Sequence, residues 1–285
     1  MSALVPCYNS ASFLGKTLES LRTQTWPNLE ILIGDDCSTD NTPEIVTQFA
    51  HENRNVRVLK RTENLGWLAN SNDLMANAAG EYMFFAFHDD IVAPTYVEKL
   101  ARKLLENQHA VMAYSDMQVF QVDGEMSEHS FPVLSGNLSR LQRGLIMVAM
   151  PENWWVPNRG LFRASAFHKT GGIRPNRQGE YSADWTWLLH LSLIGEFHRV
   201  PEILCWKYYK SKSISKQWDR NIKQKIAVRL AGVTVILNSS IDLSAKIVLV
   251  STLLAKDSIK LTRFGIKNLF SGKYLKDSSD LDSRG

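Results

Sequence analysis

The first 115 residues alternate short apolar runs with segments of helical periodicity. The apolar runs lie at residues 3–6, 29–33, 56–59, 82–87 and 110–114, and the helical patterns at 12–25, 42–52, 67–79 and 94–107. Strands that alternate with helices in this way form a mostly parallel sheet with helices on both faces. The sequence therefore predicts an α/β fold, in which ligands bind beyond the carboxyl ends of the strands.

Composition narrows the kind of protein further. The chain has 285 residues, of which 44% are hydrophobic, enough for one large α/β domain with a small extension. No stretch reaches the roughly 18 unbroken apolar residues of a membrane span, and residues 1–9 lack the features of a signal peptide. Cys7, Cys37 and Cys205 lie far apart without metal-binding spacing. We therefore expect reduced thiols in a cytoplasmic protein.

Charge divides the chain into two parts. Residues 1–206 contain 17 Lys and Arg against 23 Asp and Glu, a net charge of −6, whereas residues 207–276 contain 15 against 3, a net charge of +12. We expect a catalytic domain over residues 1–215 and a helical, basic extension over residues 216–285. Such an extension would suit peripheral contact with an anionic membrane at its inner face. No nucleic-acid partner is expected.

Two acidic clusters follow predicted strands. In the first, Asp35-Asp36-x-Ser38-x-Asp40, the residues Ser38 and Asp40 are well explained by turn chemistry and capping of the next helix. The two carboxylates at the strand end are less well explained in this way. They are suited to accept hydrogen bonds from a ribose or a base, which favours a nucleotide site.

The second cluster ends the run Phe84-Phe85-Ala86-Phe87-His88-Asp89-Asp90. Adjacent carboxylates at a strand end need a positive partner nearby, and a divalent cation bound with substrate phosphates would supply it. Capping of the helix over 94–107 explains Asp89 and Asp90 equally well. Asp184 precedes a helical pattern over 185–194, so N-capping is its ordinary interpretation.

The order of motifs resembles the family-2 glycosyltransferases of GT-A fold over roughly residues 3–215. The motifs are Pro6-x-Tyr8-Asn9, Asp35-Asp36-x-Ser38-x-Asp40, Asn64-x-Gly66, the Asp89-Asp90 strand end, Gly171-Gly172 and the segment "ADWTWLLHLSLIG" beginning at Ala183. Each motif is weak alone, and the full set in this order is specific for the family but not for a substrate. The resemblance implies an inverting transferase that uses a nucleotide sugar.

The resemblance also assigns roles to residues. It places Pro6, Tyr8, Asp35, Asp36, Asn64 and Gly66 around the nucleotide, with Lys207 and Tyr209 near its diphosphate. Asp89, assisted by Asp90, would hold Mn²⁺ or Mg²⁺. Asp184 matches the aspartate of the family's Glu-Asp pair and would be the general base.

Three positions depart from the family pattern. Phe87 stands where relatives carry the first acid of Asp-x-Asp-Asp, Ala183 replaces the glutamate of the Glu-Asp pair, and Lys207-x-Tyr209 replaces Arg-x-His. The first departure removes one potential ligand of the metal or the ribose. The departures also leave open a degenerate nucleotide-sugar-binding protein.

The sequence also offers candidate contacts for the acceptor and leaves competing enzyme classes to consider. Trp154 and Trp155 are candidates for contact with a saccharide or lipid-linked acceptor, whereas Trp187 fits core packing better. A nucleotidyltransferase shares the strand-end acids but normally has a basic, glycine-rich loop near the first strand, which residues 5–13 lack. A dinucleotide-dependent dehydrogenase is not expected, because no G-x-G-x-x-G motif follows the first predicted strand. A glycosidase that uses a pair of carboxylates stays open as an alternative.

Overall fold

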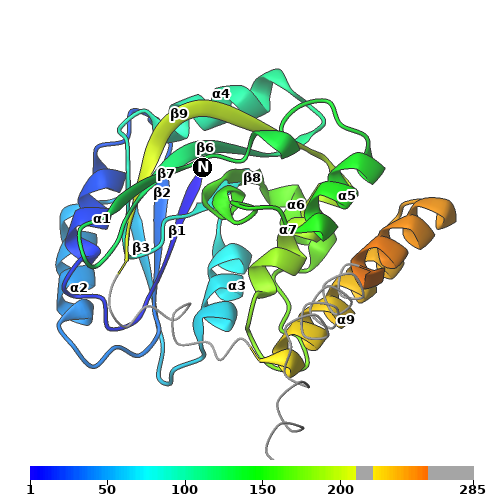
Figure 1. Ribbon diagram of the computed structural model, residues 1–285. Coiled ribbons are helices and arrows are strands. Elements are labelled where there is room, and N and C mark those ends of the chain that lie inside the picture. The colour runs from blue at the N-terminus through cyan, green and yellow to red at the C-terminus, as the bar shows by residue number, and fades with distance from the viewer. Residues whose placement is uncertain (210–220, 256–285) are drawn as a thin grey trace, which may run out of the picture.

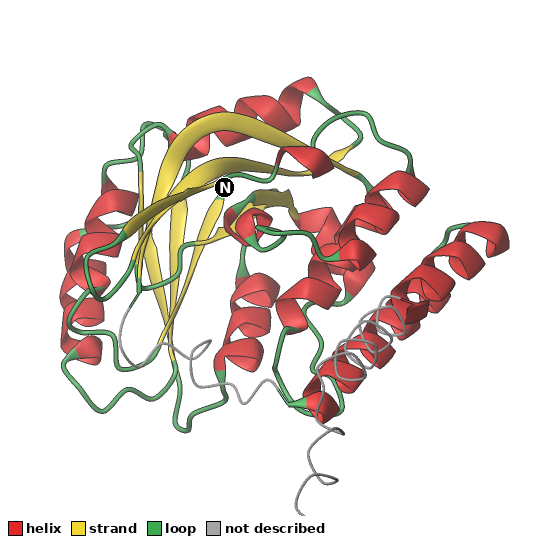
Figure 2. Cartoon of the chain, viewed as in Figure 1, coloured by secondary structure: helices red, strands yellow, loops and turns green. Residues whose placement is uncertain are grey.

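A computed structural model describes residues 1–209 and 221–255. Its centre is a curled sheet of nine strands with helices on both faces (Figures 1 and 2). Eight of the strands follow one another in the order β3-β2-β1-β4-β8-β6-β9-β5, and β7 pairs with β6 at the side. The expected α/β fold is confirmed.

The first half of the sheet is parallel, as predicted. Its strands are β1 (Ser2–Cys7), β2 (Glu30–Asp35), β3 (Val56–Lys60) and β4 (Tyr82–Phe85), and its connecting helices are α1 (Leu14–Arg22), α2 (Thr42–Glu52) and α3 (Trp67–Asn77). The strand order reverses between β1 and β4. Right-handed crossovers therefore place α1 and α2 on one face and α3 on the other (Figure 1). The carboxyl ends of β1 and β4 meet at this switch point, where ligands of such sheets bind.

The second half of the sheet contains antiparallel pairs that the alternation of strands and helices did not predict. Its strands are β5 (Asp90–Val92), β6 (Ala110–Phe120), β7 (Met126–His129), β8 (Leu161–Arg163) and β9 (Glu196–Tyr208). Only β6 and β9 run parallel here, and β8 joins the two halves through antiparallel contacts with β4 and β6. The long strand β9 carries Lys207 to the edge strand β5.

Residues 116–183, expected to be mainly irregular, contain regular helices. Besides α4 (Tyr96–Glu106), which precedes them, the structure has α5 (Arg140–Ala149), α6 (Ala164–Thr170) and two short 3-10 helices, η1 (Pro132–Leu134) and η2 (Val156–Arg159). A capping box starts α5, since the Ser139 hydroxyl accepts from the Gln142 N–H while the Gln142 side chain accepts from the Ser139 N–H. The Ser-x-x-Gln spacing was the sequence signal for this helix.

The described part of the C-terminal extension packs on the catalytic body. Helix α9 (Ile222–Asn238) lies beside α7 (Ala183–Ile194) (Figure 1). Gly232 leaves room for the indole of Trp185, with which any larger side chain would collide. Residues 243–255 are also helical, and Leu249 and Leu253 join the main hydrophobic core. The boundary at residue 215 stays a prediction, and residues 210–220 and 256–285 of the expected basic extension lie outside the described residues.

Within residues 1–209 and 221–255, none of the helices combines the length and the apolar character needed to cross a bilayer.

Candidate active site

Asp36 holds the loop after β2 against the start of α3. Its side chain is 2% exposed, and its two carboxylate oxygens accept the backbone N–H groups of Leu65 at 2.8 Å and Gly66 at 2.9 Å. The Asn64 amide donates in return to the Asp36 carbonyl oxygen at 3.2 Å. Gly66 has a φ of +85°, a backbone conformation that favours glycine. The structure thus brings together Asp36, Asn64 and Gly66, three of the residues expected at the nucleotide.

The ends of β1 and β2 are joined by a second set of hydrogen bonds. Asp35 accepts the Ser38 hydroxyl at 2.5 Å, and that hydroxyl accepts the backbone N–H of Asn9 at 2.9 Å. Asp40 accepts the backbone N–H of Ala11 at 3.1 Å. The turn chemistry expected for Ser38 and Asp40 is therefore present, and Asp35 takes part in it as well.

Pro6 and Tyr8 flank the carboxyl end of β1. Pro6 is buried within the strand, and Tyr8, one residue beyond it, is 44% exposed. An exposed aromatic ring at the switch point of the sheet is placed to contact a bound base or sugar. The nucleotide-binding role of both residues stays a prediction.

The carboxylate pair Asp89 and Asp90 lies beside two cations from distant parts of the chain. Lys207 Nζ is 2.9 Å from Asp89 Oδ2 and 3.7 Å from Asp90 Oδ1, while Arg159 Nε donates to Asp90 Oδ2 at 2.9 Å. Asp89 is 8% exposed and Asp90 2%. Two positive charges therefore compensate two buried negative ones, which makes the adjacent acids tolerable.

Asp89 stays ionised in this setting. Burial raises the pKa of Asp89, but the charges of Lys207, His88 and Arg159 lower it by more, so its pKa lies below the ordinary range. Burial likewise lowers the pKa of the Arg159 guanidinium, but Asp90, Cys205 and Asp89 together outweigh burial, so the Arg159 pKa is raised. Because folding lowers the pKa of Asp89, its ion pair with Lys207 stabilises the fold at pH values above the ordinary Asp pKa. That contribution is lost as the pH falls through the lowered value.

Asp184 occupies the second position of α7 and is half-buried. Its Oδ2 accepts the Asn158 amide at 2.7 Å, and its Oδ1 accepts the Trp185 backbone N–H at 3.0 Å. Burial raises the pKa of Asp184, although these hydrogen bonds and the Arg159 charge oppose the effect. A carboxylate with a raised pKa accepts a proton more readily than an ordinary aspartate.

The short helix η2 connects Asp184 to the acid pair. Asn158 bonds Asp184, and the next residue, Arg159, bonds Asp90. The Arg159 guanidinium also lies over the Phe87 ring at 4.8 Å and 6.0 Å from the centre of the Trp155 ring. The ends of β4, η2 and α7 thus form one site.

Sequence reasoning missed Asn158, Arg159 and Glu180. Glu180 accepts the Leu68 N–H at 3.3 Å, near the start of α3. Burial raises the Glu180 pKa, and the nearby charge of Asp36 adds to the effect. No local pattern marks these residues, because their partners lie more than 20 residues away in the chain.

The tryptophans divide as expected where the structure tests them. Trp187 is 3% exposed and packs edge-on against Phe85 and Phe162, which confirms its place in the core. Trp154 and Trp155 are only partly buried. The Trp155 ring lies 5.1 Å from the His129 ring, beside Arg159. Their contact with an acceptor stays a prediction.

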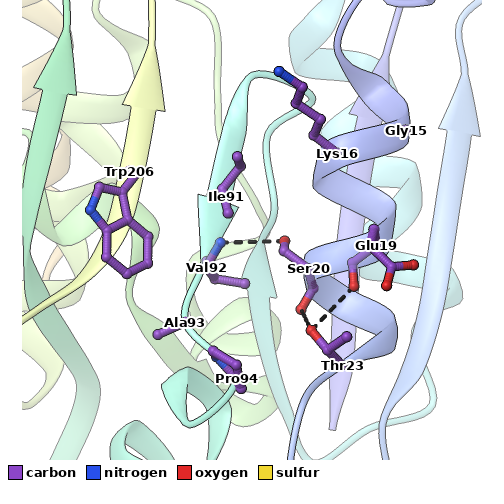
Figure 3. A pocket seen from close by; sticks show the side chains of 10 residues that line it. All are labelled: Gly15, Lys16, Glu19, Ser20, Thr23, Ile91, Val92, Ala93, Pro94 and Trp206. Carbon is purple, nitrogen blue, oxygen red and sulfur yellow. Dashed lines mark hydrogen bonds between the residues drawn. The ribbon is translucent and has the colours of Figure 1, made fainter.

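A pocket of about 490 Å³ lies behind this site, between α1 and β5 (Figure 3). Trp206 and Ile91 line it. They are the strand neighbours of Lys207 and Asp90, and successive side chains of a strand point to opposite faces. The pocket therefore opens on the face of the sheet that the acid pair does not occupy.

The residues near Asp89 fit a divalent cation poorly. Such ions prefer several oxygen ligands, mainly carboxylates, but Phe87 offers none, and both oxygens of Asp90 lie next to Arg159 or Lys207. Among the described residues, no three His, Cys, Asp or Glu side chains come together as a metal site. Asp89 is the one carboxylate left for the Mn²⁺ or Mg²⁺ that the resemblance implied.

The curled sheet, the reversal of strand order between β1 and β4 and the acids at the strand ends are the features of a GT-A glycosyltransferase fold. The sequence model of the family described as "Glycosyl transferase family 2" matches residues 2–179. The chain belongs to this family, as the order of motifs predicted. Asp184 and Lys207 lie beyond the matched stretch.

Curated relatives carry glycosyltransferase names. The chain is 27% identical over 203 residues to the chondroitin synthase of Pasteurella multocida (strain Pm70). The aligned residues are 71% of this chain and 20% of that protein. It is 37% identical over 125 residues to the uncharacterized glycosyltransferase YibD of Escherichia coli (strain K12), covering 44% of this chain and 36% of YibD. The chain thus spans about a fifth of the length of the chondroitin synthase.

Solved structures share the fold. Residues 1–349 of S. aureus TarS in complex with UDP-GlcNAc align with a TM-score of 0.71 and 19% identity, over 89% of this chain and 71% of that one. The mannosyltransferase PcManGT of Pyrobaculum calidifontis, in complex with GDP-Man and Mn²⁺, aligns with a TM-score of 0.54 and 13% identity, over 95% and 80% of the two chains. At these identities the likeness concerns the fold alone.

Proposed function

We propose that the protein transfers a sugar from a nucleoside-diphosphate sugar to an acceptor hydroxyl, with inversion at the anomeric carbon and Asp184 as general base. The observation that carries the proposal is the single site formed by Asp184, Arg159 and the pair Asp89–Asp90 at the switch point of a family-2 sheet. The glycosyltransferase names of the relatives and the UDP-GlcNAc and GDP-Man in the solved structures support it.

The donor nucleotide would lie along the carboxyl ends of β1 and β2. The residues proposed to contact it are Pro6, Tyr8, Asp35, Asp36, Asn64 and Gly66. Because both Asp36 oxygens already accept backbone N–H groups, Asp36 would act on the nucleotide in part by fixing the loop of Asn64 and Gly66. The diphosphate would then extend toward β4 and Lys207.

The reaction needs a base that takes one proton and a positive group that offsets the charge of the leaving diphosphate. Asp184 would take the proton of the acceptor hydroxyl as its oxygen attacks the anomeric carbon opposite the departing diphosphate. The raised pKa of Asp184, caused first by burial, suits this role. Asn158 would orient the carboxylate through its hydrogen bond.

The acceptor would be a saccharide or a lipid-linked saccharide, in line with the names chondroitin synthase and hyaluronan synthase among the relatives. Trp155 is the better placed aromatic contact because it lies next to Arg159.

If Trp155 binds the acceptor, Trp155→Ala raises the acceptor KM and leaves donor binding unchanged. An unchanged acceptor KM would remove Trp155 from this role.

The test of the function is incubation of the purified chain with a panel of UDP- and GDP-sugars and oligosaccharide acceptors. We expect release of nucleoside diphosphate together with a product one sugar longer, detected by mass spectrometry. Binding of a nucleotide sugar without turnover would instead establish a binding protein, and release of pyrophosphate from a sugar phosphate and a nucleoside triphosphate would establish a nucleotidyltransferase.

Exposed apolar side chains on α9 support the proposed membrane contact. Ile222, Ile226 and Leu230 recur at intervals of four residues and are 64%, 51% and 43% exposed, beside the exposed Lys223 and Lys225. An apolar stripe flanked by cations binds the surface of anionic bilayers.

We therefore expect the chain to float with vesicles that contain anionic lipid and to be released by raised salt. The matched variant Ile226→Glu places a charge on the stripe without touching the core, and should float less. Flotation that is equal with neutral vesicles, or absent with anionic ones, would contradict the membrane contact.

A further inference from the structure

The place where the donor's diphosphate charge would be offset already holds an ammonium group. Lys207 Nζ reaches Asp89 Oδ2 at 2.9 Å from β9, and antiparallel pairing sets Lys207 directly opposite Asp90. The ring of Tyr209 lies 5.0 Å from the same nitrogen. A strand register and two contacts therefore fix the ammonium beside Asp89.

This ammonium has donor capacity to spare. A lysine carries three N–H groups, and within residues 1–209 and 221–255 only Asp89 accepts a hydrogen bond from it, since Asp90 Oδ1 lies 3.7 Å away. That Asp90 oxygen is buried without a hydrogen-bond partner among the described residues. The Lys207 side chain lies near the carboxyl end of β9 and is 10% exposed.

A divalent cation would compete with Lys207 for the same carboxylate. The pair of acids and the pair of cations already balance in charge, and a further double positive charge next to Lys207 would be repelled. Phe87 stacks on Phe85 under the Arg159 guanidinium and has no atom to offer a metal. The ligand set of this site therefore favours a fixed organic cation over a bound metal.

We propose that Lys207 takes the place of the divalent cation and stabilises the donor's leaving diphosphate, so that donor binding and transfer are independent of metal. The inference rests on the proposed transfer reaction. As the bond between the anomeric carbon and the β-phosphate oxygen breaks, its electron pair stays on that oxygen. Lys207 donates a hydrogen bond to the diphosphate and keeps its proton, while the acceptor's proton goes to Asp184.

The first test needs no variant. Binding of UDP and of GDP to the full chain is measured by calorimetry in EDTA and in Mn²⁺, and release of nucleoside diphosphate from nucleotide sugars is measured in the same two buffers. We expect the same Kd and the same rate in both. Binding or release that appears only with Mn²⁺ would overturn the inference and leave the proposed transferase intact. No binding and no release in either buffer would overturn the proposed function itself.

The second test assigns the effect to Lys207. In EDTA, Lys207→Met should weaken binding of the nucleoside diphosphate roughly 10- to 100-fold, the worth of a hydrogen bond to a charged group, and Lys207→Arg should restore part of it. Lys99→Met, which removes an exposed lysine paired with Glu202, is the matched control and should bind like the parent. Equal binding by Lys207→Met and Lys99→Met would overturn the assignment. If Lys207→Met does not fold, the comparison of EDTA with Mn²⁺ still decides.

Discussion

Asp184→Asn should lower the rate of sugar transfer roughly 10²- to 10⁴-fold, the usual contribution of a general base, while the Kd for the nucleoside diphosphate stays within twofold. Asparagine has the same shape and can still accept a hydrogen bond from Asn158 or from the Trp185 N–H. It cannot take the acceptor's proton. Since the substitution also removes a charge that burial disfavours, the folded state should not be weakened.

The measurement is single-turnover transfer together with calorimetric binding of UDP and GDP. Glu152→Gln removes an exposed carboxylate from the segment before η2 and serves as the control. The parent enzyme should lose activity as the pH falls through the raised pKa of Asp184, at a higher pH than an ordinary aspartate would give. Transfer by Asp184→Asn at a rate close to that of the parent would remove Asp184 from the base role.

Arg159→Met should lower the free energy of unfolding by about 3 kcal/mol, the lower end of the cost of breaking a buried ion pair. The variant leaves Asp90, which is 2% exposed, without the guanidinium that bonds it at 2.9 Å. The cost stays at the lower end because Lys207 Nζ remains 3.7 Å from the other Asp90 oxygen. Methionine has a similar length and leaves an apolar side chain beside the Phe87 ring, over which the guanidinium lies in the parent.

Thermal and urea unfolding measure this effect. Arg22→Met is the control, because Arg22 and Glu19 are a solvent-exposed pair whose loss costs about 0–1 kcal/mol. The double variant Arg159→Met/Asp90→Asn should recover part of the stability, since it removes the uncompensated charge. A loss in Arg159→Met no larger than that in Arg22→Met would show that the ion pair does not hold the site together.

Local pattern was enough for the parallel half of the sheet. Each strand from β1 to β4 is a short apolar run, and the helices between them carry the expected periodicity, so the predicted ends are within three residues of the observed ones. The pattern failed in residues 116–183. There, β8 has three residues, too few to show a period of its own, and its place is set by pairing with β4 and β6. Helix α5 is as long as the helices of the parallel half, and its amphipathic pattern and Ser139–Gln142 capping box were overlooked in a segment rich in Trp, Pro, Gly and Asn.

The sequence by itself determined the family, the strand ends that carry Asp36 and Asp89, and the position of Asp184, because these depend on motifs a few residues long. Only the tertiary structure decided what those carboxylates contact. Lys207 reaches Asp89 across 118 residues, Arg159 reaches Asp90 across 69, and Asn158 reaches Asp184 across 26. The net charge of a site, and hence what it binds, depends on such distant partners, and chain order does not encode the distance between them.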